Sequence, residues 1–197
     1  MKVASVILAA GASTRMGESK LLLRVEGKYV IEWILDTVTS VSVQTIVVLG
    51  HNPGELVPVI NCYDVNVVIN ENYMAGMTSS FKKGILEVSG EAAFLVLGDQ
   101  LGVETDLMKL MIHKMEEDKE VLVVSPLFDG RKGHPVLFRD KLFPKILALD
   151  NREPLRDLVN SYKDNHYTVE GNQLCVIDFD TPEEFKKVVN LLRSTRF

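Results

Sequence analysis

The first twenty residues constrain this chain more than any other stretch. Residues 3–10 form an apolar run, V-A-S-V-I-L-A-A, which is typical of a strand buried on both faces of a sheet. A loop with Gly11 and Gly17 follows, and Arg15 and Lys20 add two positive charges. A strand that ends in a glycine-containing loop presents backbone N–H groups at the carboxyl edge of a sheet, which suits an anion. The stretch therefore predicts a phosphate-binding loop, in which the Arg15 fork and the Lys20 point charge hold phosphate oxygens.

Two common phosphate-binding motifs do not fit this loop. A Walker loop has four residues between its glycines, followed by Lys and then Ser or Thr. Here five residues separate Gly11 from Gly17, and Glu18 follows. A dinucleotide-binding fingerprint needs a glycine two positions after its first one, and this chain has Ser13 there.

The rest of the chain alternates between strand and helix patterns, which favours a parallel sheet with right-handed crossovers. We expect strands at residues 45–49, 65–69, 92–97 and 121–125, with helices at 29–38, 55–60, 81–88 and 105–117. The pair Asp129-Gly130 predicts a turn into a strand at 131–138, and short helices follow at 142–149 and 155–162. Residues 167–169 and 174–179 are predicted to pair as a hairpin. A capping box at Thr181 then starts a last helix that ends near Arg193.

Composition sets the broad class. A length of 197 residues favours one domain, residues 1–197, and a hydrophobic fraction of 46% is enough for a real core. The net charge is −5 with both signs mixed along the chain, so we expect no nucleic-acid partner. No apolar run approaches the roughly 20 residues of a membrane helix and no leader pattern is present, so we expect a cytoplasmic protein without a membrane partner. Cys62 and Cys175 stand in apolar surroundings and are interpreted as packed thiols.

Two later segments carry carboxylates that suit a metal. The most apolar strand, A-A-F-L-V-L, ends in Gly98-Asp99-Gln100, and a carboxylate at that edge of an α/β sheet lies where ligands bind. An exposed turn aspartate is the simpler alternative. Asp178 and Asp180 point the same way if residues 174–179 are extended. Because Mg²⁺ takes one or two carboxylates together with substrate phosphates, Asp99 is the first candidate ligand. Either Asp178 or Asp180 is the second, and we prefer Asp178.

The N-terminal loop resembles the signature L-A-A/G-G-x-S/G-x-R-M-G-x-x-K of the nucleotidyltransferases that make activated sugars, terpenoid precursors and molybdenum cofactors. The matching residues are Leu8, Ala9, Ala10, Gly11, Ser13, Arg15, Met16, Gly17 and Lys20. A second segment resembles the base-binding G-M-x-S-S of the molybdopterin cytidylyltransferases, through Gly76, Met77, Ser79 and Ser80. Helix capping by Thr78 or Ser79 explains part of that segment equally well.

Three further segments carry the same resemblance, with departures. The family's G-D-Q-P appears here with Leu101 at its last position, and Gly133-His134-Pro135 matches the G-H-P-V-L-F of the molybdopterin-modifying group. A lone histidine is usually structural, but Arg131 and Lys132 lie close to His134 in sequence, and such a corner suits an anionic acceptor. Of the family's G-D-x-G-A-R, only Arg156 is kept. The D-x-D-T-P-E-E segment resembles the C-terminal signature that helps to hold the metal.

The resemblance implies an α/β fold of the nucleotide-diphospho-sugar transferase type. This fold is a three-layer sandwich with a mostly parallel, Rossmann-like mixed sheet. It also implies transfer of CMP from CTP to the phosphate of molybdopterin, with release of pyrophosphate, since Ala10 stands where guanylyl-transferring relatives have glycine. Two alternatives remain open: a transferase with GTP or CTP and another small phosphorylated acceptor, and a non-catalytic nucleotide-sensing or cofactor-delivery protein. A molybdoenzyme or its chaperone is a further expected partner.

The resemblance also distributes the roles among residues of this sequence. Catalysis is expected from Arg15, Lys20 and Asp99, and metal binding (Mg²⁺, or Mn²⁺) from Asp99 and Asp178. Acceptor binding is expected from Arg131, His134 and Arg156. The expected nucleotide-binding residues are Leu8, Ala9, Ala10, Gly11, Ser13, Gly17, Gly76, Met77, Ser79 and Ser80.

Overall fold

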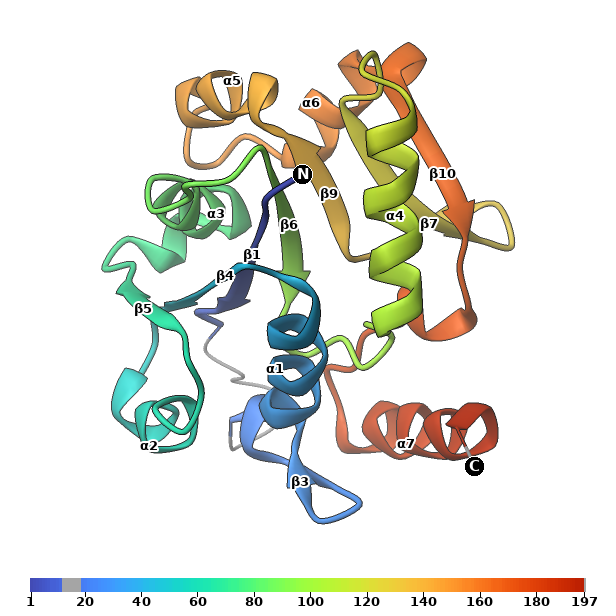
Figure 1. Cartoon of the computed structure of the whole chain (residues 1–197). Helices are drawn as coiled ribbons and strands as arrows, with labels where there is room; N and C mark the ends of the chain where they lie inside the picture. Colours follow the sequence, from blue (N-terminus) through green and yellow to red (C-terminus); the bar gives the residue numbers. More distant parts are fainter. Residues whose placement is uncertain (12–18, 197) are drawn as a thin grey trace.

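A mixed β-sheet lies between two layers of helices (Figure 1) in the computed structural model, which describes residues 1–11 and 19–196. The strands of this sheet are β1 (Val3–Ala9), β4 (Gln44–Leu49), β5 (Asn66–Ile69), β6 (Ala92–Leu97), β7 (Val123–Phe128), β8 (Arg131–Lys132), β9 (Val136–Arg139) and β10 (His166–Glu170). A separate ribbon pairs β2 (Arg24–Val25) with β3 (Lys28–Tyr29). The helices are α1 (Val30–Val41), α2 (Val57–Ile60), α3 (Met77–Ile85), α4 (Thr105–Glu117), α5 (Phe143–Ala148), α6 (Leu155–Ser161) and α7 (Pro182–Arg196).

The strand order confirms the predicted fold class. Across the described residues the sheet reads β10-β7-β9-β6-β1-β4-β5, with β8 paired to β7. The pairs of β1 with β4 and β6, of β4 with β5 and of β7 with β10 are parallel. Only β9 and β8 run against their neighbours, so the sheet is mixed and mostly parallel. Its central strands are β6 and β1, whose carboxyl ends carry the Asp99 turn and the N-terminal loop.

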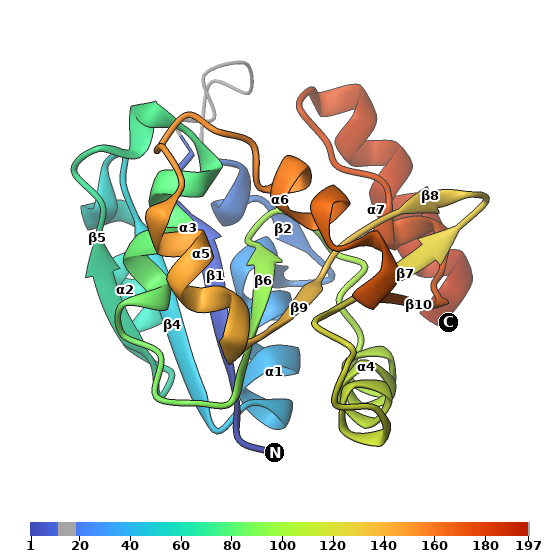
Figure 2. The ribbon, with the colours of Figure 1, turned by 90° about the horizontal axis from the view of Figure 1, so that it is seen from above.

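Both faces of the sheet are buried, which explains the continuous apolar runs. Ile7 aligns with Val47 and Val96 on the face that α1 and α4 cover. The neighbouring Val6 aligns with Ile46 on the opposite face, which α3, α5 and α6 cover (Figure 2). Successive strand residues point to opposite faces, so a strand in this position needs apolar side chains at both alternating positions.

The predicted hairpin at residues 167–179 is wrong. β10 pairs in parallel with β7, and the next segment turns into a 3-10 helix at Gln173–Cys175 instead of forming a strand. The side chain of Asn172 explains the difference, because its Oδ1 accepts a hydrogen bond of 2.9 Å from Leu174 N and fixes a local turn. The segment that follows, with Asp178 and Asp180, is neither helix nor strand and lies outside the sheet.

The predicted caps had mixed outcomes. The capping box at Thr181 is confirmed, since Glu184 N donates to Thr181 Oγ1 and Thr181 N donates to Glu184 Oε2. Capping of α3 by Thr78 or Ser79 is wrong, because both lie inside the helix and Gly76 takes the cap position. The Gly76 φ of 120° is in the left-handed region that favours glycine, so the backbone itself turns the chain into α3.

The two cysteines differ in burial. Cys175 is a buried free thiol as expected, but Cys62 is exposed, because it lies in the loop beyond α2 at the sheet's outer edge. On α4, Leu110 is 39% exposed, whereas Met108 lies in the core. Within residues 1–11 and 19–196, no helix combines the length and apolar character needed to span a bilayer.

Candidate functional site

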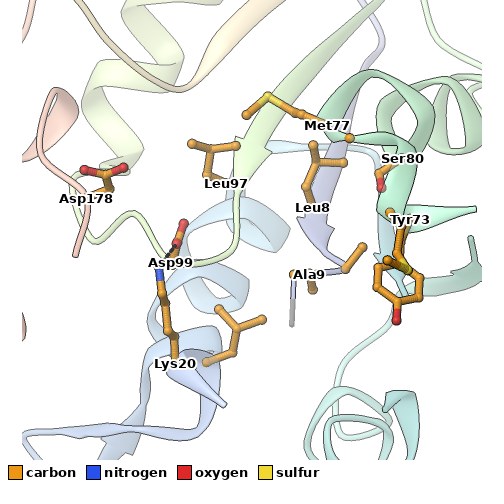
Figure 3. A pocket seen from close by; sticks show the side chains of 14 residues that line it. Leu8, Ala9, Lys20, Tyr73, Met77, Ser80, Leu97, Asp99 and Asp178 are labelled. Atoms are coloured by element: carbon orange, nitrogen blue, oxygen red, sulfur yellow. Dashed lines mark hydrogen bonds and ion pairs between the residues drawn. The ribbon is translucent and has the colours of Figure 1, made fainter. Parts of the chain in front are cut away.

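A cavity of about 520 Å³ opens at the carboxyl ends of β1 and β6, and we call it the β1–β6 cavity (Figure 3). Most of the residues that the sequence assigns to nucleotide binding, catalysis and the metal line it. They are Leu8, Ala9, Ala10, Gly11, Lys20, Gly76, Met77, Ser80, Asp99 and Asp178. Ser13, Arg15 and Gly17, which the sequence assigns to the same site, lie outside the described residues. The cavity therefore brings together the N-terminal loop, the turn after β6, the start of α3 and the segment before α7.

Lys20 carries the positive charge of the described cavity wall. Its Nζ lies 3.3 Å from Asp99 Oδ2 and also donates to Asp180 Oδ1, and its side chain is only 12% exposed. Burial opposes the charge, but the hydrogen bond to Asp180 and the charges of Asp99 and Asp180 outweigh it, so the pKa of the ammonium is raised. Lys20 is therefore a permanent cation that the two carboxylates hold in place.

Asp178 lines the cavity on the same side as Asp99 and Lys20, across from Tyr73 (Figure 3). Its neighbour Phe179 is buried. Asp180 forms an ion pair with Lys20 and does not line the cavity, whereas Asp178 lines the cavity together with Asp99 and forms no ion pair with Lys20. Among the described residues there is no group of three or more metal-ligating side chains. Two carboxylates completed by phosphate oxygens are a usual Mg²⁺ environment, so Asp99 and Asp178 fit the expected metal.

Asn70 organises the start of α3, and the sequence analysis did not identify it. It follows β5 and is 1% exposed. Its Nδ2 donates to Ser79 Oγ and Ser80 Oγ at 2.9 and 3.0 Å. Ser79 Oγ in turn donates to carbonyl oxygens of the loop before α3, so Ser79 supports the wall, while Ser80 itself lines the cavity. The sequence did offer one signal for Asn70, because it is a polar residue directly after the strand predicted at residues 65–69.

Tyr73 lines the cavity, and the sequence analysis did not identify it either. Its ring forms one wall (Figure 3), and its hydroxyl lies 3.2 Å from His51 Nδ1. Gly50 makes this position possible, because a Cβ there would lie 2.6 Å from the Cβ of Tyr73 and 2.9 Å from that of Ala10. The break that Gly50 introduces after β4 thus lets an aromatic ring pack beside the N-terminal loop.

A second cavity, of about 670 Å³, adjoins the first, and we call it the β7–β9 cavity. The two cavities share Gly76 and Met77. The polar side chains in its lining are Thr78, Ser125, Lys132, His134, Asn151, Arg152, Glu153, Arg156, Asn160 and His166. Of the expected acceptor-binding residues it contains His134 and Arg156. It does not contain Arg131, whose guanidinium is exposed and donates to Val176 O at 3.2 Å.

His134 is neutral in this cavity. Burial lowers its pKa to about 4, although a hydrogen bond with the Leu95 backbone and the charge of Asp178 act in the opposite direction. Its Nδ1 is buried and has no hydrogen-bond partner in the described part of the chain. A buried polar atom of this kind is costly unless a ligand or water completes it, which favours a ligand-contacting role for His134.

The backbone carbonyl of Cys175 connects three segments of the candidate site by hydrogen bonds. Cys175 O accepts hydrogen bonds from Gln100 Nε2 at 2.6 Å and from His134 N at 2.9 Å. Gln100 follows Asp99, and Cys175 lies three residues before Asp178. The Cys175 carbonyl therefore fixes the segment with Asp178 against the turn with Asp99 and against the loop with His134.

Comparison with known proteins agrees with this arrangement. The family model described as "MobA-like NTP transferase domain" matches residues 5–166. The chain is 28% identical over 182 residues to the molybdenum cofactor cytidylyltransferase of Escherichia coli (strain K12), covering 91% of this chain and 92% of that protein. It is 30% identical over 131 residues to a probable molybdenum cofactor guanylyltransferase of Natranaerobius thermophilus, covering 65% of this chain and 62% of that protein.

Solved structures share the fold. The protein Rv0371c of Mycobacterium tuberculosis H37Rv superposes with a TM-score of 0.84 at 23% identity, over 96% of this chain and 98% of that one. A second structure of Rv0371c, a complex with manganese, superposes with a TM-score of 0.77 at 22% identity, over 96% and 99% of the two chains. The matched family model spans most of the chain, including the N-terminal loop, α3, the Asp99 turn and the His134 loop. The chain therefore belongs to the MobA-like NTP transferase family of nucleotidyltransferases.

Proposed function

We propose that this protein transfers CMP from CTP to the phosphate of a molybdopterin-type acceptor and releases pyrophosphate. The observation that carries the proposal is the pair of adjoining cavities, which meet at Gly76 and Met77. The β1–β6 cavity has a buried lysine and carboxylates suited to a triphosphate and its metal. The β7–β9 cavity is large enough for a small heterocyclic acceptor. A reaction that joins a nucleotide to a second molecule needs two such sites with a common boundary.

In the proposed mechanism, a phosphate oxygen of the acceptor attacks the α-phosphorus of CTP, and the bond to the β-phosphate oxygen breaks. Phosphoryl-type transfer depends on positioning and on neutralising charge, so no nucleophilic side chain is required. Lys20 neutralises phosphate oxygens, and the loop that begins at Gly11 is expected to contribute backbone N–H donors. Asp99 and Asp178 would hold a Mg²⁺ ion, which would neutralise negative charge on the triphosphate when it is bound.

The choice of CTP is supported by two observations. Ala10 lines the β1–β6 cavity, and its methyl group occupies space that glycine would leave to a larger base. Ser80 lines the same cavity, and its hydroxyl suits the edge of a pyrimidine. The product would pass to a molybdoenzyme or its chaperone.

The deciding experiment measures pyrophosphate release by the purified chain with molybdopterin and each of CTP, GTP, ATP and UTP, with Mg²⁺ or Mn²⁺ present. We expect release with CTP and at least tenfold less with GTP. Faster release with GTP would assign the chain to guanylyl transfer. Release that needs a different phosphorylated acceptor would replace molybdopterin, and no release with any acceptor, despite nucleotide binding, would favour a non-catalytic role.

A further inference from the structure

Lys132, His166 and Ser125 form a hydrogen-bonded row on the wall of the β7–β9 cavity. Lys132 Nζ lies 3.1 Å from His166 Nδ1, and His166 Nε2 lies 2.8 Å from Ser125 Oγ. An ammonium group can only donate, so Nδ1 accepts, and Nε2 carries the proton and donates to Ser125. Burial lowers the pKa of His166 to about 4, and the charge of Lys132 acts in the same direction. The imidazole is therefore a neutral support with one fixed tautomer.

The β7–β9 cavity carries positive charge without matching negative charge. Lys132, Arg152 and Arg156 line the cavity, and none of them forms an ion pair with any residue in the ranges 1–11 and 19–196. Glu153 is the one acidic residue among the described lining residues. The chain as a whole has a net charge of −5, so this local excess of cations is not a general property of its surface. An anionic ligand group would be attracted to it.

The row lies away from the reacting phosphate. Ser125 is on β7, which is two ladder positions from β6 and three from β1, or about 10 and 14 Å at ordinary strand spacing. The reacting oxygen must approach the α-phosphorus beside Asp99, at the ends of β1 and β6, to about 3–3.5 Å. Lys132 therefore cannot contact the reacting phosphate while it stays bonded to His166.

We propose that Lys132, held by the His166–Ser125 pair, binds a second anionic group of the acceptor, at the end of the acceptor opposite its reacting phosphate. This inference rests on the proposed function, because it assumes that the acceptor occupies the β7–β9 cavity. It adds that the acceptor has anionic groups at two ends about 10 Å apart. Lys132 is the residue that recognises the second anion, and His166 is a positioning residue that aims the ammonium into the cavity.

The first test separates acceptor binding from nucleotide binding. Lys132→Met should raise the acceptor KM by about 10- to 100-fold, the effect of losing one charge-assisted hydrogen bond. The KM for CTP should stay within about twofold, because Lys132 is outside the β1–β6 cavity. Lys163→Met is the matched control, since Lys163 is exposed, lies three residues before His166 and is not in the cavity lining. Equal acceptor KM values in wild type and Lys132→Met would overturn the inference.

Two substitutions of His166 test the positioning role. Asparagine can place its oxygen where Nδ1 accepts from Lys132, whereas glutamine can place its amide donor where Nε2 bonds to Ser125. We expect His166→Asn to keep the acceptor KM near the wild-type value and His166→Gln to raise it. A purely structural histidine would show the opposite order or no difference between the two variants at equal thermal stability.

A third test does not depend on turnover. The full chain, labelled with ¹⁵N-histidine, is titrated with inorganic phosphate and, separately, with molybdate, to compare a phosphate with a metal oxyanion. We expect a saturable shift of the His166 ring signals with at least one oxyanion, and loss of that shift in Lys132→Met but not in Lys163→Met. No shift with either oxyanion would overturn the anion site. If the His166 signals shift but the protein shows no nucleotidyl transfer, the anion site stands and only the proposed function is refuted.

Discussion

The two adjoining cavities differ most in how their charges are balanced. In the β1–β6 cavity, Lys20 is held between Asp99 and Asp180, so its positive charge is compensated before any ligand arrives. In the β7–β9 cavity, the described lining has three basic side chains and one acidic one. A phosphate that enters the first cavity must compete with existing ion pairs, whereas an anion that enters the second gains new ones.

This difference suggests a division of labour between the cavities. Compensated charges keep the β1–β6 cavity ordered and make its affinity for a triphosphate depend on a divalent cation, which takes over the neutralisation of the carboxylates. Uncompensated cations let the β7–β9 cavity bind an anion directly. We therefore expect substitutions in the first cavity to reduce kcat strongly and those in the second to act mainly on the acceptor KM.

The largest effect is expected for Asp99→Asn. Loss of one group that stabilises transition-state charge costs about 10²–10³ in rate, and Asp99 also positions Lys20, so we expect a loss of about 10³-fold or more in kcat. Thermal stability should change little, because Lys20 keeps its contact with Asp180. Metal titrations of turnover, with thermal unfolding in parallel, measure both effects.

Asp178→Asn is the companion variant for that experiment. An amide oxygen can still coordinate a cation, and Asp178 does not contact Lys20, so a smaller loss with a higher metal requirement is expected. Asp99→Asn with normal metal-dependent turnover would place the metal elsewhere. A larger loss for Asp178→Asn than for Asp99→Asn would reverse their assigned roles.

Lys20→Met should reduce kcat by about 10²–10³-fold, because a phosphate contact in the transition state is lost. Lys28→Met is the control, since it removes another lysine that forms an ion pair, here with Asp36 on the surface at 2.7 Å. The raised pKa of Lys20 keeps its ammonium charged, so the activity of the wild type should show no loss from Lys20 titration between pH 6 and 9. Equal kcat values for Lys20→Met and the control would remove Lys20 from the site.

His134, which lines the β7–β9 cavity, should make the free energy of unfolding depend on pH. The folded protein binds a proton at His134 only near pH 4, whereas the unfolded chain does so near 6.5. The unfolded state therefore binds more protons between these values, and the free energy of unfolding falls as the pH falls through this window. A buried group of this kind contributes up to about 3 kcal/mol of pH-dependent loss.

Urea unfolding at pH 7 and pH 4.5 tests this prediction. The difference between the two pH values should shrink in His134→Gln, although His166 retains a contribution in the same direction. His113→Gln is the control, because His113 is an exposed residue on α4. An unchanged pH dependence in His134→Gln would mean that His134 is already accessible to protons in the folded protein.

The fold was predictable because its signals are local. Residues 3–10 and 92–97 are apolar at every position but one, which is how a strand covered on both faces must look, and the structure buries them between α1 and α3. The hairpin prediction failed because β-strand pairing is a tertiary choice. Residues 167–169 have the same alternation whether they pair with a following strand or with β7.

Residues of the candidate site could be predicted where the local sequence marks them, but not where their place depends on a contact with a distant part of the chain. Asp99 follows a predicted strand and Lys20 belongs to the predicted phosphate-binding loop, and the structure brings the two side chains to 3.3 Å. Tyr73 reaches the β1–β6 cavity only because Gly50, from another loop, leaves room for it. Lys132 and His166 are 34 residues apart, and their contact depends on the parallel pairing of β7 and β10 that the sequence analysis missed.

The smallest predicted effect concerns the choice of nucleotide. Ala10 is 7% exposed and lines the β1–β6 cavity, so Ala10→Gly removes one methyl group from its wall and gives a purine more room. One methyl group in a binding pocket changes discrimination by about 10- to 200-fold, and we expect the lower end, a tenfold fall in the ratio of CTP to GTP kcat/KM. Ala4→Gly is the control, because Ala4 is a fully buried residue of β1 that does not line the cavity, so its substitution loosens the strand without widening the base site. Competition assays with both triphosphates measure the ratio. If Ala4→Gly and Ala10→Gly shift it equally, the effect is one of backbone flexibility and Ala10 does not select the base.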